Sequence, residues 1–358
     1  MNRESLKNTS RIVVKLGTGI LTDTQKRLAP EKMEPLVEQI ARQRLAGKEI
    51  VVVTSGAIGA GMGILGYDRR PTDLAELQAC AAVGQSQLMG IYTRLFAKHG
   101  LKVAQVLLTH EDLADHDRHL NARNTLVKLL EHGVVPIVNE NDVVSFAEIK
   151  VGDNDTLSAL VACLLPADLL VILTTAEGLI EGFGTAHARL ISQVDKIDSQ
   201  IERIARGTNS PTAVGGMITK IKAARIVTRA GIPLVIATGY KPGVLDMILN
   251  GEEVGTLFNP SLRKLKSRKR WIAFFHHPKG TLVVDDGAKV AIREKGKSLL
   301  PPGIVRVEGE FKAGEVVRVC DLNGTEFARG LVKFSAQEIR SGTVHRKEVI
   351  HRDDLVVL

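Results

Sequence analysis

Short apolar runs that end in glycine-rich or polar clusters recur along the first two-thirds of this 358-residue chain. Residues 11–16 (RIVVKL) form one such run, which stops at Gly17-Thr-Gly19. Between the runs, apolar residues recur at helical spacing, as in residues 30–46, which close at Gly47. Runs of this length bounded by turn signals predict buried strands, and the spacing between them predicts helices.

The alternation of strand and helix predicts right-handed βαβ units, and therefore a mainly parallel sheet covered by helices on both faces. A core with only 4% aromatic residues must be built from Leu, Ile, Val and Ala, which suits helices packed on a parallel sheet. The predicted strands are residues 11–16, 49–54, 103–108, 134–139, 169–174 and 233–237, and the predicted helices are residues 30–46, 72–99, 121–132 and 221–230.

The length predicts two domains, and the pattern changes near residue 260. Residues 263–270 (RKLKSRKR) hold six basic residues in eight, and short strands with turn signals follow, among them Asn323-Gly324, a strong hairpin signal. We predict a first domain over residues 1–262, a basic linker over 263–274 and a small, mostly β domain over 275–358. The whole net charge of +8 lies after residue 262, where the sequence has 20 Lys and Arg but only 12 Asp and Glu. The two domains are therefore expected to bind different partners.

Three scattered cysteines, Cys80, Cys163 and Cys320, predict a reducing compartment rather than a disulfide or zinc framework. The first eleven residues are polar and carry no apolar segment typical of a secretory signal. No apolar run approaches the length of about 18 residues that a membrane span needs. We therefore expect a cytoplasmic protein with no membrane contact.

Ligands of parallel α/β sheets bind beyond the carboxyl ends of the strands, and glycine-rich clusters lie at two such places. Lys15 with Gly17-Thr-Gly19 offers backbone amides and an ammonium group to a phosphate, although a structural turn is an equal alternative. Ser55, Gly56 and the small residues after them could likewise hold an anion or allow tight helix–strand packing.

Two dense polar clusters, residues 139–142 (NEND) and 152–155 (GDND), follow apolar segments. They are either solvated turns or parts of a site. An asparagine side chain can donate to a carboxylate and accept from an ammonium group, which suits an amino-acid substrate. Asp155 could orient lysines or hold a metal ion.

A further anion site is predicted where Gly215-Gly216 opens a helix that carries Lys220 in its first turn. Lys15 and Lys220 could flank one transferring phosphoryl group. Such a transfer needs mainly positioning and charge neutralisation. The residues thus favour an ATP-dependent phosphotransferase.

In this order, the motifs resemble those of the amino-acid kinase family, in particular its branch that phosphorylates the side-chain carboxylate of glutamate. The small β domain resembles a PUA domain, notably in GTLVVDDGAKVAI and SLLPPGIVRVEGEF. The segments that carry the kinase resemblance are VVKLGTGIL (13–21), VVVTSGAIGAGM (51–62), IVNENDVV (137–144), VGDNDTLSALVA (151–162) and GGMITKIKAA (215–224).

The resemblance implies a three-layer αβα sandwich, a first domain that is catalytic, and transfer of the ATP γ-phosphoryl group to L-glutamate as the first step of proline biosynthesis. It implies Mg²⁺ on the phosphates, with no residue assigned as its ligand, and proline as a feedback inhibitor. A homo-oligomer is expected, and RNA is a candidate partner of the PUA-like domain. The implied catalytic residues are Lys15, Lys220 and Asp155; those for the substrate are Ser55, Gly56, Asn139, Asp142 and Asn154; and those for the nucleotide are Lys15, Thr174, Thr175, Val214, Gly215, Gly216, Met217, Ile218, Thr219 and Lys220.

Departures from the family pattern gather on the nucleotide side. Thr175 stands where the family usually has Asp, Ile180 where it usually has Tyr, and Ala213-Val214 where it usually has Gly-Thr. An Asp-Pro pair after residue 180 is missing, and the tail is short between Gly342 and His351. Two alternatives therefore stay open: an RNA-binding protein that uses its basic second part, and a kinase of another small carboxylate.

Overall fold

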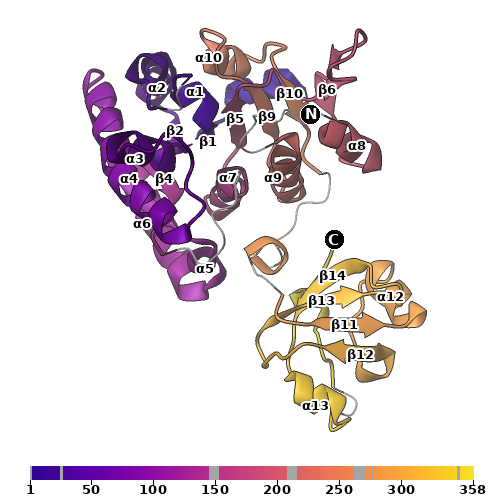
Figure 1. Cartoon of the computed structure of the whole chain (residues 1–358). Helices are drawn as coiled ribbons and strands as arrows, with labels where there is room; N and C mark the ends of the chain where they lie inside the picture. Colours follow the sequence, from indigo (N-terminus) through magenta and orange to yellow (C-terminus); the bar gives the residue numbers. More distant parts are fainter. Residues whose placement is uncertain are drawn as a thin grey trace. The chain divides into compact units, whose positions relative to one another are not determined.

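The computed structural model describes residues 2–24, 27–144, 153–207, 216–261, 269, 271–275, 278–344 and 347–358. The chain divides into two compact units, Met1–Lys264 and Leu265–Leu358, and Figure 1 shows both. Part of the predicted linker is therefore structured: Trp271–Phe275 forms a short π-helix (η2), and its Ile272 and Ala273 are buried within the second unit. The apolar sequence WIAFF explains why this segment packs into the second unit, because burial of its apolar side chains is favourable.

The first unit is a sheet flanked by helices (Figure 1), and the predicted fold class, with its mainly parallel sheet, is confirmed. Among the described strands of this sheet, β9 and β10 pair antiparallel, and the other neighbours pair parallel. The strand order is β3 (Val103–Leu108), β4 (Val135–Glu140), β2 (Glu49–Val53), β1 (Arg11–Leu16), β5 (Leu169–Thr174), β9 (Leu234–Thr238), β10 (Thr256–Phe258) and β8 (Gln193–Val194). A separate two-stranded sheet pairs β6 (Ile180–Glu181) with β7 (Arg189–Leu190).

The helices of the first unit cover both faces of the sheet. None of those in the described ranges has the length and apolar character that crossing a membrane requires. They are η1 (Arg3–Asn8), α1 (Thr18–Leu21), α2 (Pro30–Leu45), α3 (Ala57–Leu65), α4 (Leu74–Ala97), α5 (His110–Ala114), α6 (His116–Glu131), α7 (Asp153–Leu164), α8 (Ser199–Gly207), α9 (Met217–Arg229) and α10 (Val244–Leu249).

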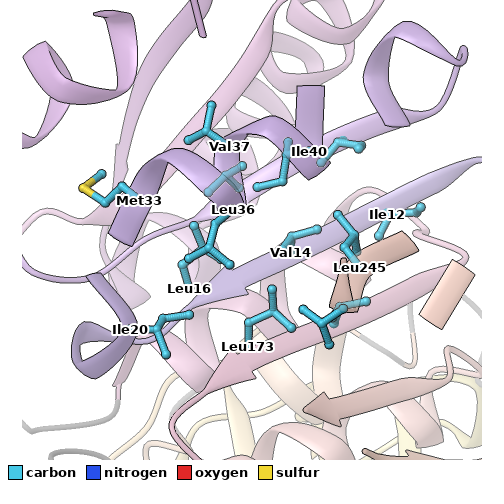
Figure 2. Packing of buried hydrophobic residues seen from close by; sticks show 14 of the residues in the cluster. Ile12, Val14, Leu16, Ile20, Met33, Leu36, Val37, Ile40, Leu173 and Leu245 are labelled. Atoms are coloured by element: carbon cyan, nitrogen blue, oxygen red, sulfur yellow. The ribbon is translucent and has the colours of Figure 1, made fainter. Parts of the chain in front are cut away.

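One face of β1 belongs to the main hydrophobic core. Ile12, Val14 and Leu16 are fully buried there, and Figure 2 shows them beside Leu36 and Ile40 of α2. Because side chains alternate along a strand, Val13 and Lys15 point to the opposite face. That face is covered by α7, which packs on β1, β4, β5 and α9. The alternation thus places a lysine beneath a helix, away from water.

Two glycines allow α3 and α4 to cross at very close range. A Cβ added at Gly61 of α3 would lie 1.8 Å from the carbonyl oxygen of Cys80, and one added at Gly84 of α4 would lie 1.8 Å from that of Ala57. Neither space could hold a methyl group. At Gly61, therefore, the glycine-rich segment after Ser55 serves helix–helix packing, a use that the sequence reading did not include.

The second unit contains a five-stranded sheet over its own apolar core. The predicted hairpin at Asn323-Gly324 is confirmed, because β13 and β14 pair antiparallel and Gly324 adopts a left-handed φ of 77°. The strand order is β12 (Ile304–Glu308), β11 (Thr281–Val284), β13 (Val316–Cys320), β14 (Glu326–Leu331) and β15 (Leu355–Val357). Besides η2, the described part of this unit contains the helices α12 (Asp286–Arg293), η3 (Pro301–Gly303), α13 (Ala336–Arg340) and η4 (Arg352–Asp354).

Candidate active site

One buried carboxylate joins the two lysines that the sequence singled out. Asp155 Oδ1 lies 2.7 Å from Lys15 Nζ, and Asp155 Oδ2 lies 3.2 Å from Lys220 Nζ. The hydroxyl of Thr219 donates to the same Oδ2 at 2.6 Å. The Asp155 side chain is 0% exposed, and the two lysines are 6% and 5% exposed. These four predicted residues therefore form one cluster.

The cluster carries two ammonium groups and one carboxylate. Burial alone would raise the pKa of the Asp155 carboxyl, but the charges of Lys15 and Lys220 and the hydrogen bonds from Lys15 and Thr219 hold this pKa below its ordinary value. Burial lowers the pKa of Lys220, while Asp155 opposes that shift. With both lysines charged, one positive charge is left over in a place with little water, where it attracts an anion strongly.

Lys220 and Thr219 are placed by the start of α9. Gly216 is the N-cap of this helix, and its carbonyl oxygen also lies 2.8 Å from the Thr219 hydroxyl. The first turn of a helix presents unpaired N–H groups and a partial positive charge. The amino end of α9 therefore adds to the attraction that the two lysines exert on a phosphate.

The turn after β1 lies against the carboxyl end of β5. The Gly17 N–H donates to the carbonyl oxygen of Leu173 at 2.9 Å. A Cβ added at Gly19 would lie 2.6 Å from the Cγ2 atom of Thr175. The predicted phosphate turn and the predicted nucleotide residues Thr174 and Thr175 are thus neighbours at one edge of the sheet.

Tyr240 belongs to the same edge, although the sequence reading did not select it. Its hydroxyl donates to the carbonyl oxygen of Gly19 at 2.9 Å. The residue lies two positions after the end of β9, so the rule that ligands gather beyond strand ends could have found it. The predicted strand 233–237 is followed by Thr238 and Gly239, which form no dense polar cluster, so the sequence gave no signal there.

A second cluster adjoins the lysines, because Asn154 precedes Asp155 on α7. Asn154 Nδ2 donates to Ser55 Oγ and to Asn139 Oδ1, both at 3.2 Å. Ser55 and Asn139 lie at or beyond the carboxyl ends of β2 and β4. Gly56 turns the chain from β2 into α3 with a φ of 105°, a conformation that L side chains rarely adopt. Four of the predicted substrate residues thus meet at one place.

Asp142 lines a small cavity beside this cluster, with a volume of about 20 Å³. The cavity is lined by Ala57, Ala81, Gln85, Leu107, Glu140, Asn141, Asp142 and Val143. Gln85 is a lining residue that sequence reasoning missed. It lies within α4, where a single polar residue is an ordinary feature of an amphipathic helix.

Not every predicted nucleotide residue lies in the lysine cluster. Met217 is buried, whereas Ile218 is 48% exposed and turns away from the packed side of α9. Val214 and Gly215 lie outside the described residues.

The described residues contain no group of three or more His, Cys, Asp or Glu side chains placed to hold a metal ion. Asp155 is the carboxylate of the lysine cluster, and both of its oxygens contact Lys15, Lys220 or Thr219. These contacts are the ones that the first predicted role of Asp155, the orientation of lysines, requires.

Comparison with known families identifies the family to which the chain belongs. The sequence pattern of the amino acid kinase family matches residues 10–238, and that of the PUA domain matches residues 280–353. The first match covers well over half of the chain, so the chain belongs to the amino acid kinase family and carries a PUA domain in its second unit. The predicted family membership is confirmed.

The relatives that match along the whole chain carry a more particular name. A glutamate 5-kinase of Geobacter sulfurreducens is 47% identical over 368 residues, which cover 99% of each chain. A glutamate 5-kinase of Moorella thermoacetica is 47% identical over 371 residues, which cover 99% of this chain and 98% of that protein. Among solved structures, a carbamate kinase from Giardia lamblia bound to AMP-PNP has a TM-score of 0.52 at 20% identity over 71% of this chain and 100% of that one, a likeness that concerns the fold alone.

Proposed function

We propose that this chain transfers the γ-phosphoryl group of ATP to the side-chain carboxylate of L-glutamate, which yields L-glutamyl 5-phosphate, the first step of proline biosynthesis. The observation that carries the proposal is the Asp155-bridged lysine pair beside the Asn154 cluster. The lysine pair suits a phosphate, and the amide and hydroxyl groups suit an amino acid. The full-length relatives named glutamate 5-kinase support the same substrate.

In this reaction a carboxylate oxygen of glutamate forms a bond to the γ-phosphorus, and the bond from that phosphorus to the β–γ bridging oxygen breaks. ADP leaves with the electron pair. No covalent intermediate with the protein is needed. Lys15 and Lys220 would neutralise the charge on the transferring group. Asp155 would hold both ammonium groups in place, so neither lysine would have to move during the reaction.

The remaining residues bind and orient the substrates. Ser55, Asn139 and Asn154 would bind glutamate, and Asp142 would approach its ammonium group from the cavity side. Thr174, Thr175 and the first turn of α9 would meet the nucleotide. Mg²⁺, when bound, would neutralise phosphate charge. The described residues offer it no carboxylate cluster, so we expect the nucleotide phosphates to hold it.

The finer partners stay predictions. Proline is expected to act as a feedback inhibitor, and the chain is expected to form a homo-oligomer. RNA is a candidate partner of the PUA domain, and a cytoplasmic location is expected. RNA binding as the main activity is not favoured, because the relatives that match both units are named as kinases.

Formation of an acyl phosphate tests the proposal. Purified protein with ATP, Mg²⁺ and glutamate should yield a hydroxamate when hydroxylamine is present, whereas aspartate, acetylglutamate and carbamate should yield little. Absence of hydroxamate at millimolar glutamate would refute the proposal.

A pair of variants tests the role of the lysine cluster. Lys220→Ala should lower turnover on the order of 10²-fold or more, because it removes a charge aimed at the transferring group. Lys222→Ala, on the exposed side of the same helix, is the matched control and should retain activity. Equal turnover of the two variants would remove Lys220 from the mechanism.

A further inference from the structure

Four side-chain amides form a continuous chain of hydrogen bonds that ends at the candidate substrate site. Asn154 Nδ2 donates to Asn139 Oδ1 at 3.2 Å, and Asn139 Nδ2 donates to Gln85 Oε1 at 2.9 Å. Gln85 Nε2 then donates to Gln105 Oε1 at 3.0 Å. The four residues come from α7, β4, α4 and β3, so the chain connects four separate elements.

The bonds all run in one direction, because each amide donates to the carbonyl oxygen of the next residue outward. Asn154 Nδ2 also donates to Ser55 Oγ, so its amide nitrogen has two partners. Its Oδ1 atom is buried and has no hydrogen-bond partner among the described residues. A buried oxygen without a donor is unfavourable in a folded protein and indicates a ligand that donates to it.

We propose that Gln85 is a positioning residue which, together with Gln105, keeps the carbonyl oxygen of Asn154 directed to the ammonium group of the amino-acid substrate. This inference rests on the proposed function, because it assigns a substrate group to the same site. An ammonium group has three donors and no acceptor, so it binds an amide through its oxygen. Asn154 must therefore present Oδ1 and not Nδ2.

The direction of the chain decides which atom Asn154 presents. If all four amides were turned over, Asn154 Oδ1 would accept from Asn139 and its nitrogen would face the substrate. Gln85 transmits the direction, since it accepts from Asn139 and donates to Gln105. Gln85 also lines the cavity that Asp142 lines, so the chain of amides lies beside a second predicted substrate residue.

Gln105 offers a way to set the direction without contact with the substrate, because it is exposed at the outer end of the chain. Glutamate at this position can only accept, so Gln105→Glu should preserve the observed direction. Lysine can only donate, so Gln105→Lys should force Gln85 to turn its oxygen outward and reverse the chain. Gln87, an exposed residue of α4, provides matched controls for charge as Gln87→Glu and Gln87→Lys.

The test measures the KM of each variant for glutamate and for ATP in the hydroxamate assay. Gln105→Lys should raise the KM for glutamate about tenfold, the effect of one lost hydrogen bond to a charged group, and leave the KM for ATP unchanged. Gln85→Met, which breaks the chain, should act in the same direction. Gln105→Glu and both Gln87 variants should match the wild-type protein.

Glutarate, which is glutamate without its amino group, supplies a readout that a general loss of structure would not give. Its inhibition constant should be the same for the wild-type protein and Gln105→Lys, because glutarate has no ammonium group that could bind the Asn154 oxygen. If Gln105→Lys and Gln87→Lys had the same KM for glutamate, the role of Gln85 and Gln105 would be refuted. The proposed function would still stand, provided that the wild-type protein forms the hydroxamate. A parallel rise of the KM for ATP would refute that role too. Wild-type protein without hydroxamate formation would instead refute the proposed function.

Discussion

Lys15 Nζ and Asp155 Oδ1 lie 2.7 Å apart, although one residue lies near the end of the first strand and the other in the first turn of a helix far along the chain. Both side chains are almost completely buried. A buried ion pair adds little stability by itself, because two charges have lost their water. Here the carboxylate is shared with Lys220, so the cluster keeps a surplus positive charge. That surplus is what a phosphoryl group would neutralise.

Replacement of Asp155 by asparagine should be costly for both stability and activity. The side chain keeps its size, but two buried ammonium groups lose their counter-charge. We expect the free energy of unfolding to fall by about 3–5 kcal/mol and hydroxamate formation to fall on the order of 10²-fold or more. Urea unfolding and the hydroxamate assay measure the two effects. Glu38→Gln, which alters an exposed pair with Arg42, is the control and should change neither. An Asp155→Asn protein as stable as this control would contradict the shared-carboxylate interpretation.

The rate should depend on the charge of Lys220 at alkaline pH. Because burial lowers the pKa of Lys220, its ammonium group loses its proton at a pH below 10.5, the ordinary pKa of a lysine. The neutral amine no longer stabilises the transferring group, so kcat/KM for ATP should fall as pH rises through that lowered pKa. This parameter reports groups of the free enzyme. Lys222→Ala should show the same alkaline limb, and a constant kcat/KM up to pH 10.5 would argue against the role of Lys220.

Two glycines of α4 should respond oppositely to the same substitution. Gly84→Ala would place a methyl group 1.8 Å from the Ala57 carbonyl oxygen, so α3 and α4 must separate. We expect destabilisation of about 1–3 kcal/mol and reduced activity, because α3 begins at the candidate site. Gly90→Ala meets its nearest atom at 3.7 Å and should be neutral or more stable by up to about 1 kcal/mol, from helix propensity. Thermal unfolding of both proteins checks this, and equal melting temperatures would rule out the close crossing.

Gly19 and Thr175 should behave as a coupled pair. Gly19→Ala brings a Cβ within 2.6 Å of the Thr175 methyl group, so the turn after Lys15 must move. We expect the KM for ATP to rise about tenfold, since small displacements at a phosphate site are costly. Thr175→Ser removes that methyl group and should restore most of the affinity in the double variant. Additive effects of the two substitutions would show that the residues act independently.

Much of the fold was predictable because local patterns specify it. The strands predicted at residues 11–16, 103–108 and 169–174 have those bounds in the structure. The helix predicted at residues 121–132 begins earlier, at His116, because Asp115 caps it by accepting from the N–H groups of Asp117 and Arg118. Such a cap is a single side chain among several candidates, so it gives a weaker signal than apolar periodicity.

The site was predictable in part. Lys15 and Lys220 stood out because charged residues within apolar or glycine-rich segments are unusual. Asp155 stood out as part of the dense polar cluster at residues 152–155. Gln85 and Tyr240 gave no such signal, since each is an ordinary residue type in its own segment. Their importance comes from neighbours that are distant in the sequence, Asn139 and Gly19.

The sequence by itself determined the strand–helix alternation, the parallel sheet, the second β unit and the segments that carry the site. These follow from periodicity and turn chemistry, which act over a few residues. Only the tertiary structure decided that one carboxylate serves both lysines and that Gly61 and Gly84 bring two helices together. It also decided that, among the residues the structure describes, the amide chain leaves the Asn154 oxygen without a donor. Those facts depend on distances between residues remote in the chain, and such distances arise only when the sheet is assembled and the helices are packed on it.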